Sequence, residues 1–305
     1  METLATQIAV VAGVLAACFS GPFVALWILL WRKRRLRAQR RSPINRGLLR
    51  SPGHTLREQL DEMDRNANWD VAMLMIVPLM ALTLYLGQSQ VLKAASSAPV
   101  AVIYGMAAVG FIAYMVRKLW KAFARIDNLK TGLDAELAVG QELDQLMRQG
   151  AAVFHDFPGE KFNIDHVVIA QQGVFAIETK GYSKLNKHGG RAGATVVFDG
   201  QTVKFPNWTS KEPLEQADRQ ARWLAQWISS AVGTAIQVLP VLALPGWFVE
   251  RTGRGDVRVY NGRELANLLR ARGTRALSDD EVQRVIHQVE QRCRTVAPQY
   301  LAKPE

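Results

Sequence analysis

The stretch that decides the fold is NIDHVVIAQQGVFAIETK, residues 163–180. Two apolar runs of strand length, rich in β-branched residues, flank a short polar turn and predict a β-hairpin. Asp165, Glu178 and Lys180 interrupt these runs at positions that otherwise favour burial. Because charged groups are rarely buried without a partner, their presence here requires a chemical explanation.

The register of the hairpin gives that explanation. If the turn is centred on the Gln-Gln pair, Asp165 lies opposite Glu178, and facing carboxylates repel unless a positive charge lies between them. Lys180 shares the face of Glu178, because strand side chains alternate. The apolar run at 174–177 is typical of a strand covered on both faces. A slip of one residue, with Gly173 in the special backbone position, stays open and would move the two acids to opposite faces.

A third acid comes from an upstream helix, which apolar residues at helical spacing predict over residues 132–147. Glu136 lies on the apolar stripe with Val139 and Leu143, and Gly140 removes a side chain that would hold the helix away from the sheet. A carboxylate on a buried face is costly unless it is paired or bound to a cation. The alternative, a different rotation of the helix, leaves Glu136 in solvent.

Three oxygen donors around one point suit Mg²⁺ or Mn²⁺, hard cations that bind carboxylates, carbonyls and water. Such an ion offsets the repulsion, lowers the pKa of a bound water and polarises a phosphodiester. Lys180 can then stabilise the developing negative charge or hold the attacking water.

The rest of the C-terminal part alternates helices and strands, which predicts an α/β domain with a mixed β-sheet flanked by helices. The other expected elements are strands at 152–157, 237–244 and 256–260, a second hairpin at 194–205 with Asp199-Gly200 in a tight two-residue turn, and helices at about 211–231, 261–270 and 278–291. A capping box from Ser278 to Glu281 opens the last helix.

The N-terminal part differs in composition. Ile8–Trp31, Val71–Leu92 and Ala94–Val116 contain no charged residue, and each is long enough to cross a hydrocarbon core of about 30 Å. We therefore expect a membrane part over residues 1–127, with transmembrane helices at about 8–31, 71–90 and 96–116 and a basic cytoplasmic segment at 32–70. Because Pro78 interrupts the second apolar segment, a re-entrant or buried hairpin over 71–116 is the alternative.

Basic residues predict the orientation. Residues 32–50 hold nine Lys and Arg, which favours a cytoplasmic position for this segment. The charge follows the first apolar segment, so that segment is expected to be a retained anchor. The prediction is a multi-pass protein of a bacterial-type inner (cytoplasmic) membrane, with its N-terminus outside and its domain at 128–305 in the cytoplasm. The lipid bilayer is then one partner.

The net charge of +11 mostly reflects this membrane part. From Lys130 onward there are 22 Lys and Arg against 20 Asp and Glu, a net of +2, so the high pI does not itself indicate nucleic-acid binding. Two cysteines exclude a disulfide framework and a Cys-rich zinc site. A transporter or channel lacks support, since the apolar segments carry no ionisable residue.

Three stretches, KTGLDAELAVGQELDQL, NIDHVVIAQQGVFAIETKGYSK and PLEQADRQARWL, resemble the nuclease-related domain (NERD) family of the PD-(D/E)xK nuclease superfamily, over about residues 128–240. The resemblance implies a restriction-endonuclease-like fold and a site at Asp165 and the triplet Glu178, Thr179, Lys180. It also implies supporting roles for Glu136 and Gln216, and a metal shell of Asp165, Glu178, Glu136 and the main-chain carbonyl of Thr179. Ala135 stands where the family often has Gly.

The resulting hypothesis is a membrane-anchored, Mg²⁺- or Mn²⁺-dependent nuclease, with DNA ahead of RNA as substrate. The basic loop 181–193 follows Lys180 directly, so Lys184, Lys187 and Arg191 are candidate phosphate contacts; the alternative is an ordinary polar loop. A different class of function is a membrane-tethered binding module for nucleic acid or protein that keeps the nuclease fold without cleavage.

The remaining polar and aromatic candidates have simpler interpretations. His166 faces away from Asp165, so a hydrogen-bonding role is favoured over a metal ligand, and His155 is read in the same way. Gln216 and Gln220 lie one helical turn apart and either bind a phosphate or water or form a solvated stripe. The spacing of Trp223 and Trp227 favours the core, whereas Trp208 is core or interface.

Overall fold

The computed structural model describes residues 13, 20–21, 24–36, 43–44, 46–91, 98–184, 191–270 and 275–297. The chain divides into two compact units. The first comprises Met1–Asn45, Glu62–Ile126 and Gln299–Glu305, and the second comprises Arg46–Asp61 and Asp127–Pro298. Residues 46–61, which the sequence analysis assigned to the membrane part, therefore belong to the same unit as the central hairpin.

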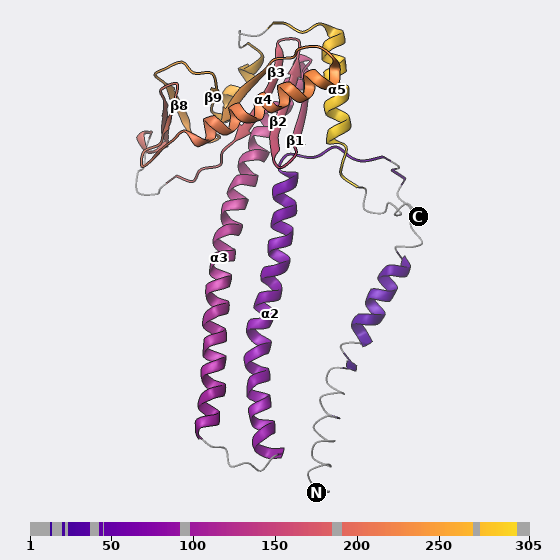
Figure 1. Cartoon of the computed structure of the whole chain (residues 1–305), viewed down its shortest axis with the longest axis vertical. Helices are drawn as coiled ribbons and strands as arrows, with labels where there is room; N and C mark the ends of the chain where they lie inside the picture. The colour runs from indigo at the N-terminus through magenta and orange to yellow at the C-terminus, as the bar shows by residue number, and fades with distance from the viewer. Residues whose placement is uncertain are drawn as a thin grey trace. The chain divides into compact units, whose positions relative to one another are not determined.

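Two long helices are the main described elements of the N-terminal half: α2 (His54–Val91) and α3 (Ala98–Asp144) (Figure 1). Each is longer than expected, because the apolar stretch continues into polar sequence without a break. Helix α2 takes in most of the polar link expected before residue 71, and Pro78 lies inside it without ending it. Helix α3 takes in most of the helix expected at 132–147.

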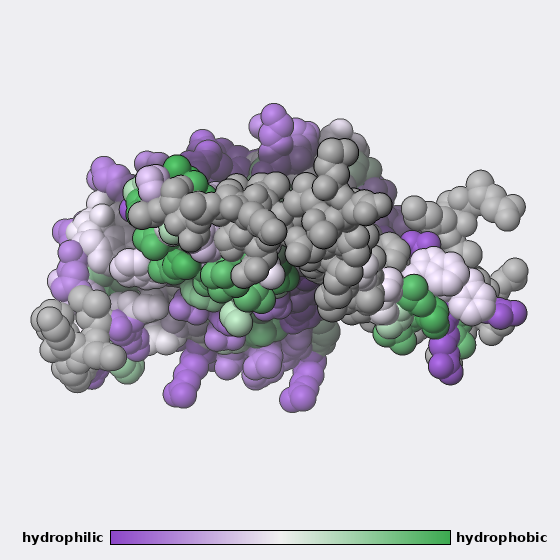
Figure 2. Space-filling view, turned by 90° about the horizontal axis from the view of Figure 1, so that it is seen from below, coloured by the Kyte–Doolittle hydropathy of each residue, from purple (hydrophilic) through white to green (hydrophobic). Residues whose placement is uncertain are grey.

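The apolar parts of α2 and α3 are long and hydrophobic enough, by length and composition, to cross a membrane. The most apolar stretches of the two helices are 0% and 6% buried. They therefore do not form the buried helical hairpin that was considered as an alternative. Hydrophobic side chains are correspondingly visible on the surface in Figure 2. In the first unit Lys118 pairs with Asp70 at 2.6 Å. The span expected at 8–31 lies mostly outside the described residues, although residues 24–36 are helical.

The second unit is built on a five-stranded mixed sheet with the order β1-β2-β3-β7-β9. Its strands are β1 (Ala152–Pro158), β2 (Asn163–Ala170), β3 (Gly173–Thr179), β7 (Val238–Ala243) and β9 (Arg258–Tyr260). Strands β1, β2 and β3 are antiparallel, whereas β3, β7 and β9 are parallel. His166 pairs with Ile177 and Ala170 with Gly173, which confirms the register predicted from the Gln-Gln turn.

Helices cover both faces of this sheet, so the fold is the α/β class predicted from the sequence. Helices α4 (Glu212–Val232) and α5 (Asp279–Cys293) pack on one face, where Val174 and Ala176 of β3 are buried. The end of α3 and the 3₁₀ helix η3 (Gly262–Arg270) pack on the other face. Strand β3 lies between these layers and is buried along its whole length.

A smaller four-stranded sheet has the order β6-β5-β4-β8. Its strands are β4 (Thr195–Phe198), β5 (Val203–Lys204), β6 (Thr209–Ser210) and β8 (Phe248–Arg251). The hairpin predicted around Asp199 forms, but Phe198 pairs with Val203, so its connection has four residues and not two. The Asp199 side chain accepts hydrogen bonds from the N–H groups of Gln201 and Thr202, which stabilises this longer turn.

The C-terminal elements follow the sequence closely. Helix α5 opens with the predicted capping box between Ser278 and Glu281. The helix expected at 261–270 forms as η3, with 3₁₀ and not α geometry. Two further 3₁₀ turns, η1 (Gln145–Gln149) and η2 (Ala192–Ala194), complete the described elements.

Candidate active site

The candidate site lies where β2 and β3 leave their ladder. The last paired residues are His166 and Ile177, so Asp165 and Glu178 are the next residues on the two strands. Asp165 Oδ2 accepts a hydrogen bond of 2.6 Å from the main-chain N–H of Thr179. This contact holds the Asp165 carboxylate at the start of the Glu178-Thr179-Lys180 triplet.

Glu178 and Lys180 form an ion pair in this position. Lys180 Nζ lies 2.7 Å from Glu178 Oε1, and the Glu178 side chain is only 3% exposed. Lys180 Nζ also donates to Gln216 Oε1 at 2.9 Å, from the second turn of α4. The lysine is therefore held between a strand carboxylate and a helix amide, which fixes the direction of its ammonium group.

Glu136 belongs to α3 and is 8% exposed, so the predicted alternative of a solvated side chain does not occur. Burial raises its pKa to about 8, and repulsion from Asp156 and Glu178 adds to the rise. A hydrogen bond from the Gly53 main chain and the charge of Lys180 oppose it. Glu178 and Lys180 of the hairpin therefore affect the pKa of Glu136. Glu136 itself belongs to α3, the end of which packs on the face of the sheet opposite α4 and α5.

The pKa values of Asp165 and Lys180 are also shifted by the charged groups around them. Burial raises the pKa of Asp165 well above its usual range, reinforced by Glu178 and Glu136 and opposed by the Thr179 N–H and by Lys180. For Lys180 burial alone lowers the pKa, but the ion pair with Glu178 and the charge of Asp165 outweigh it and raise the pKa. The site is thus a mutually repelling group of carboxyls around one retained ammonium.

The carboxylate oxygens of Asp165, Glu178 and Glu136 are the kind of ligand that a hard divalent cation takes. The three side chains are not arranged around a common metal position. Glu178 Oε2 is buried and has no hydrogen-bond partner, which leaves one oxygen for such an ion. Among the described residues, no group of three or more His, Cys, Asp or Glu side chains is arranged to hold a metal ion. A closed three-carboxylate cradle is therefore not seen among the described residues.

Of the loop residues predicted to contact phosphate, Lys184 and Arg191 are described and Lys187 lies outside the described residues. Lys184 Nζ donates to the carbonyl of Gly246 and lies 5.5 Å from the ring centroid of Trp247. The Arg191 guanidinium lies 5.3 Å from the ring centroid of Phe248. Both cations therefore lie against aromatic rings at or beside β8.

Four aromatic rings form a cluster next to these cations, and we call it the aromatic cluster: Tyr182, Phe205, Trp208 and Trp247. Trp208 stacks on Phe205 with 4.0 Å between ring centroids and is 41% exposed. A small cavity of about 180 Å³ is lined by Phe205, Trp208 and Trp247 among others. Since Tyr182 follows Lys180 by two residues, the cluster lies close to the candidate site along the chain.

The two predicted hydrogen-bonding histidines contact each other. Their Nδ1 atoms lie 2.9 Å apart, and His155 Nε2 lies 3.0 Å from Asp144 Oδ1. Burial lowers the pKa of both rings, and it lowers that of His166 further with the help of His155. Both ring nitrogens of His155 have protein partners, which supports the predicted hydrogen-bonding role.

The two glutamines of α4 have different partners. Gln216 binds Lys180, whereas Gln220 is buried and donates to the carbonyl of Asn163 at 3.1 Å. The proposed solvated stripe is therefore wrong for Gln220. Trp223 and Trp227 are partly buried against the core, as their spacing predicted.

The sequence analysis missed one group of site residues. Arg50, Thr55 and Asp156 form a polar network in which Asp156 lies 106 and 101 positions from its two partners in sequence. No motif or periodicity links such distant positions. The available signal was the presence of charged and hydroxyl side chains in the basic segment at 32–70.

Comparison with known proteins agrees with this architecture. The family model described as "Nuclease-related domain" (NERD) matches residues 131–245. No curated protein and no solved structure matches the chain. The family match begins five residues before Glu136 and includes the hairpin and the helix that carries Gln216. The chain therefore carries a domain of the nuclease-related family, with its restriction-endonuclease-like α/β fold, over residues 131–245.

Proposed function

We propose that the chain is a membrane-anchored nuclease that uses a divalent cation, Mg²⁺ or Mn²⁺, to hydrolyse phosphodiester bonds, with DNA ahead of RNA as substrate. The observation that carries this proposal is the grouping of Asp165 and Glu178 beside Lys180 at the adjacent ends of β2 and β3. Placing a half-buried acid beside a buried one is costly, and a structural role alone does not require it.

Asp165, Glu178 and the main-chain carbonyl of Thr179 would hold the cation, with Glu136 as an additional donor. When bound, such an ion polarises the phosphodiester and lowers the pKa of a water bound to it. The unpartnered oxygen of Glu178 supports this assignment. The raised pKa of Glu136 means that its carboxyl holds a proton more readily until a positive charge approaches.

Lys180 supplies positive charge from the protein itself. Because its pKa is raised, its ammonium stays charged at neutral pH and can stabilise negative charge that develops on the phosphate. Gln216 accepts a hydrogen bond from this ammonium and directs it, so we assign Gln216 a positioning role. Glu178 has a second role here, because it pairs with the same ammonium.

The aromatic cluster and the cations Lys184 and Arg191 are the proposed contacts for nucleic acid, together with Lys187. Stacking of a base on an exposed aromatic ring contributes about 1–3 kcal/mol and tolerates any sequence. Trp208 is the exposed ring of the cluster, and it lies against Phe205 in a fixed orientation. This combination favours contact with unpaired bases near the scissile phosphate.

The proposed anchor consists of the apolar parts of α2 and α3 and of the earlier apolar segment at 8–31. The basic residues after the first segment favour a cytoplasmic position for the domain, in an inner membrane of the bacterial type. The two long helices support this placement by their length, composition and exposed apolar surface.

The experiment is a cleavage assay on the full-length protein in detergent, with Mg²⁺ or Mn²⁺ and with single-stranded DNA, double-stranded DNA and RNA. Wild type is compared with Asp165→Asn, Glu178→Gln and Lys180→Ala. Glu215→Gln is the matched control, because Glu215 is an exposed acid next to Gln216. We expect the three site variants to lose about 100-fold or more in kcat and the control to lose less than about 2-fold. Equal cleavage by all variants would exclude this site.

A second candidate function is a membrane-tethered module that binds nucleic acid or protein without cleavage. The open arrangement of the carboxylates among the described residues is the observation that favours it. Binding that persists after loss of Glu136, Asp165 and Glu178, in a wild-type protein without turnover, would support this function and exclude the first.

A further inference from the structure

The segment Arg46–Asp61 packs on the nuclease-related domain although it lies outside the family match. Leu48 forms an antiparallel bridge with Val296, with hydrogen bonds of 2.8 and 3.2 Å between their main chains. The Arg50 N–H also donates to the carbonyl of Cys293, the last residue of α5. These contacts attach the segment to the C-terminal end of the domain, at Cys293 and Val296.

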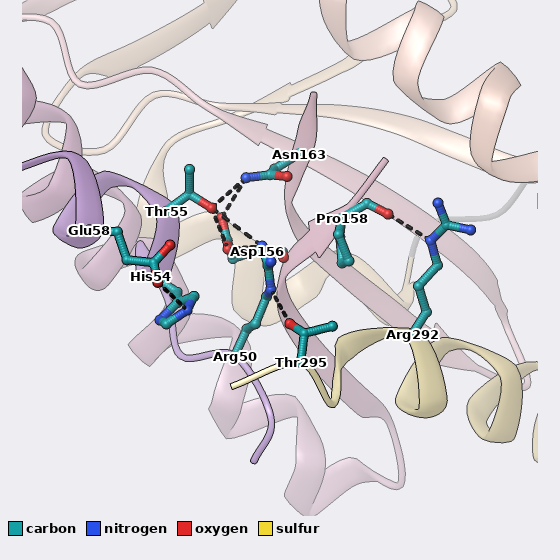
Figure 3. A network of polar contacts seen from close by, with 9 residues as sticks. All are labelled: Arg50, His54, Thr55, Glu58, Asp156, Pro158, Asn163, Arg292 and Thr295. Carbon is teal, nitrogen blue, oxygen red and sulfur yellow. Dashed lines mark hydrogen bonds and ion pairs between the residues drawn. The ribbon is translucent and has the colours of Figure 1, made fainter. Parts of the chain in front are cut away.

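Arg50 and Thr55 of the segment bind Asp156 of β1 (Figure 3). Arg50 lies 2.7 Å and the Thr55 hydroxyl 2.8 Å from Asp156 Oδ2. Asp156 is 3% exposed and has a φ of 48°, an unusual value for a residue other than glycine. Such a conformation persists only where the surroundings determine it, and here the segment supplies those contacts.

The same hydroxyl reaches the strand that carries Asp165. Asn163 Nδ2 donates to Thr55 Oγ1 at 2.5 Å and to Asp156 Oδ1 at 3.2 Å. Asn163 opens β2 two residues before Asp165. Thr55 therefore fixes the entry of the strand on one side of the candidate site.

The turn at Pro52 and Gly53 reaches the other side, where Glu136 lies on α3. Gly53 has a φ of 65°, and a Cβ on it would lie 3.7 Å from Glu136 Oε2, so the main chain of this turn borders the Glu136 carboxylate. A Cβ on Gly53 would lie 2.3 Å from Leu133 Cδ1, and a Cβ on Gly140 would lie 2.7 Å from Pro52 Cγ. Both glycines are needed for this close approach. Gly140 makes room first for Pro52 of the segment, and His155 of β1 is the next neighbour, 3.5 Å from the same Cβ.

We propose that Arg46–Asp61 is a positioning element of the candidate active site, which holds Glu136 through Gly53 and the start of β2 through Thr55. The segment contacts elements on both sides of the site, α3 through Pro52 and Gly53 and the start of β2 through Thr55. The nuclease-related domain defined by residues 131–245 is then incomplete in its catalytic geometry. This inference rests on the function proposed above.

The first test compares two glycine substitutions in the full-length protein. Gly53→Ala places a Cβ against Leu133 and beside Glu136, whereas Gly233→Ala adds the same left-handed strain at an exposed helix end with nothing within 4 Å. We expect Gly53→Ala to lower kcat by about 10-fold or more, with KM changed by less than about 2-fold. Gly233→Ala should leave both values within about 2-fold of wild type.

A second pair of variants covers the case in which Gly53→Ala does not fold. Thr55→Val keeps the shape of the side chain but removes the hydroxyl that joins Asp156 to Asn163. Glu58→Ala, on the exposed side of the same helix, is its control. We expect about a 5-fold or larger loss of kcat for Thr55→Val and no loss for Glu58→Ala.

Binding of Mn²⁺, followed by electron paramagnetic resonance, gives a readout that does not depend on turnover. We expect weaker Mn²⁺ binding in Gly53→Ala and Thr55→Val than in their controls, at equal helix content by circular dichroism. If Gly53→Ala and Thr55→Val match their controls in kcat and in Mn²⁺ binding, the positioning role of the segment is overturned. A wild type that binds Mn²⁺ without cleaving removes the proposed function alone, and a wild type that does neither removes both.

Discussion

At the scale of single residues, the site depends on one lysine among three carboxyl groups. Lys180 contacts both Glu178 and Gln216, so its ammonium has a fixed position and a raised pKa. Burial raises the pKa values of Glu136 and Asp165, and repulsion from neighbouring carboxylates adds to the rise. Their proton affinity should therefore respond to any cation that enters.

The first prediction concerns the orientation of Lys180. Gln216→Leu removes the acceptor that directs the ammonium and should lower kcat by about 10-fold with little change in KM. Gln216→Glu keeps an acceptor at the same place and should retain more activity than Gln216→Leu. Steady-state kinetics of both variants checks this, and equal activity of the two would contradict a positioning role.

The second prediction concerns stability and pH without metal. The folded protein holds the Glu136 proton up to about pH 8, whereas an unfolded glutamate releases it near pH 4.5. Between these values the folded state binds more protons, so its stability relative to the unfolded state falls as pH rises, by on the order of a few kcal/mol. In Glu136→Gln this dependence should be smaller.

Thermal melts in EDTA from pH 5 to 8 measure this effect. A wild-type Tm that falls toward pH 8, together with a flatter profile for Glu136→Gln, is the expected result. Identical slopes for the two proteins would show that Glu136 does not carry the raised pKa.

At the scale of elements, the segment Arg46–Asp61 completes the domain from a distant part of the sequence. Its ion pair between Arg50 and Asp156 is largely buried, whereas the pair between Arg222 and Asp218 on α4 is exposed. Both pairs join an arginine to an aspartate, but Arg50 also donates to Thr295 and Thr55, and Arg222 and Asp218 are one helical turn apart. They provide a comparison within one chain.

The third prediction uses this comparison. Arg50→Met leaves the Asp156 carboxylate buried without its cation and should cost about 3–5 kcal/mol of stability. Arg222→Met breaks a surface pair and should cost about 1 kcal/mol or less. Denaturant unfolding of both variants measures the difference, and equal costs would mean that the segment is only loosely attached.

The elements also show how far sequence reasoning extends. The register of the hairpin was predictable, because a short turn between two apolar runs constrains the pairing of the strands locally. The role of residues 46–61 was not, because Arg50 and Asp156 are 106 positions apart and no local pattern reports their contact. The long helices were underestimated for a similar reason, since a change from apolar to polar sequence does not by itself end a helix.

At the scale of the whole molecule, a nuclease-related domain is combined with long apolar helices in one chain. The N-terminal segment of that domain lies between two apolar stretches of the sequence, and α2 begins inside it. Residues 46–61 therefore connect the domain of the candidate site directly to the apolar helix α2 along the chain. The function proposed here requires that the domain lie in the cytoplasm.

The fourth prediction tests that topology. A green fluorescent protein fused after residue 305 should fluoresce in a bacterial host, because it folds in the cytoplasm, whereas alkaline phosphatase in the same place should be inactive. Alkaline phosphatase fused after residue 96, between the two apolar helices, should be active. The reverse pattern of reporter activities would contradict the proposed orientation.

The central claim is that Asp165 and Glu178 bind a divalent cation beside Lys180. Anomalous diffraction from crystals of the protein grown with Mn²⁺ tests it most directly. The account predicts one strong manganese peak bonded to both carboxylates, with Glu136 turned toward it. A Mn²⁺-saturated crystal with no peak there, in which Glu178 still pairs only with Lys180, would contradict it.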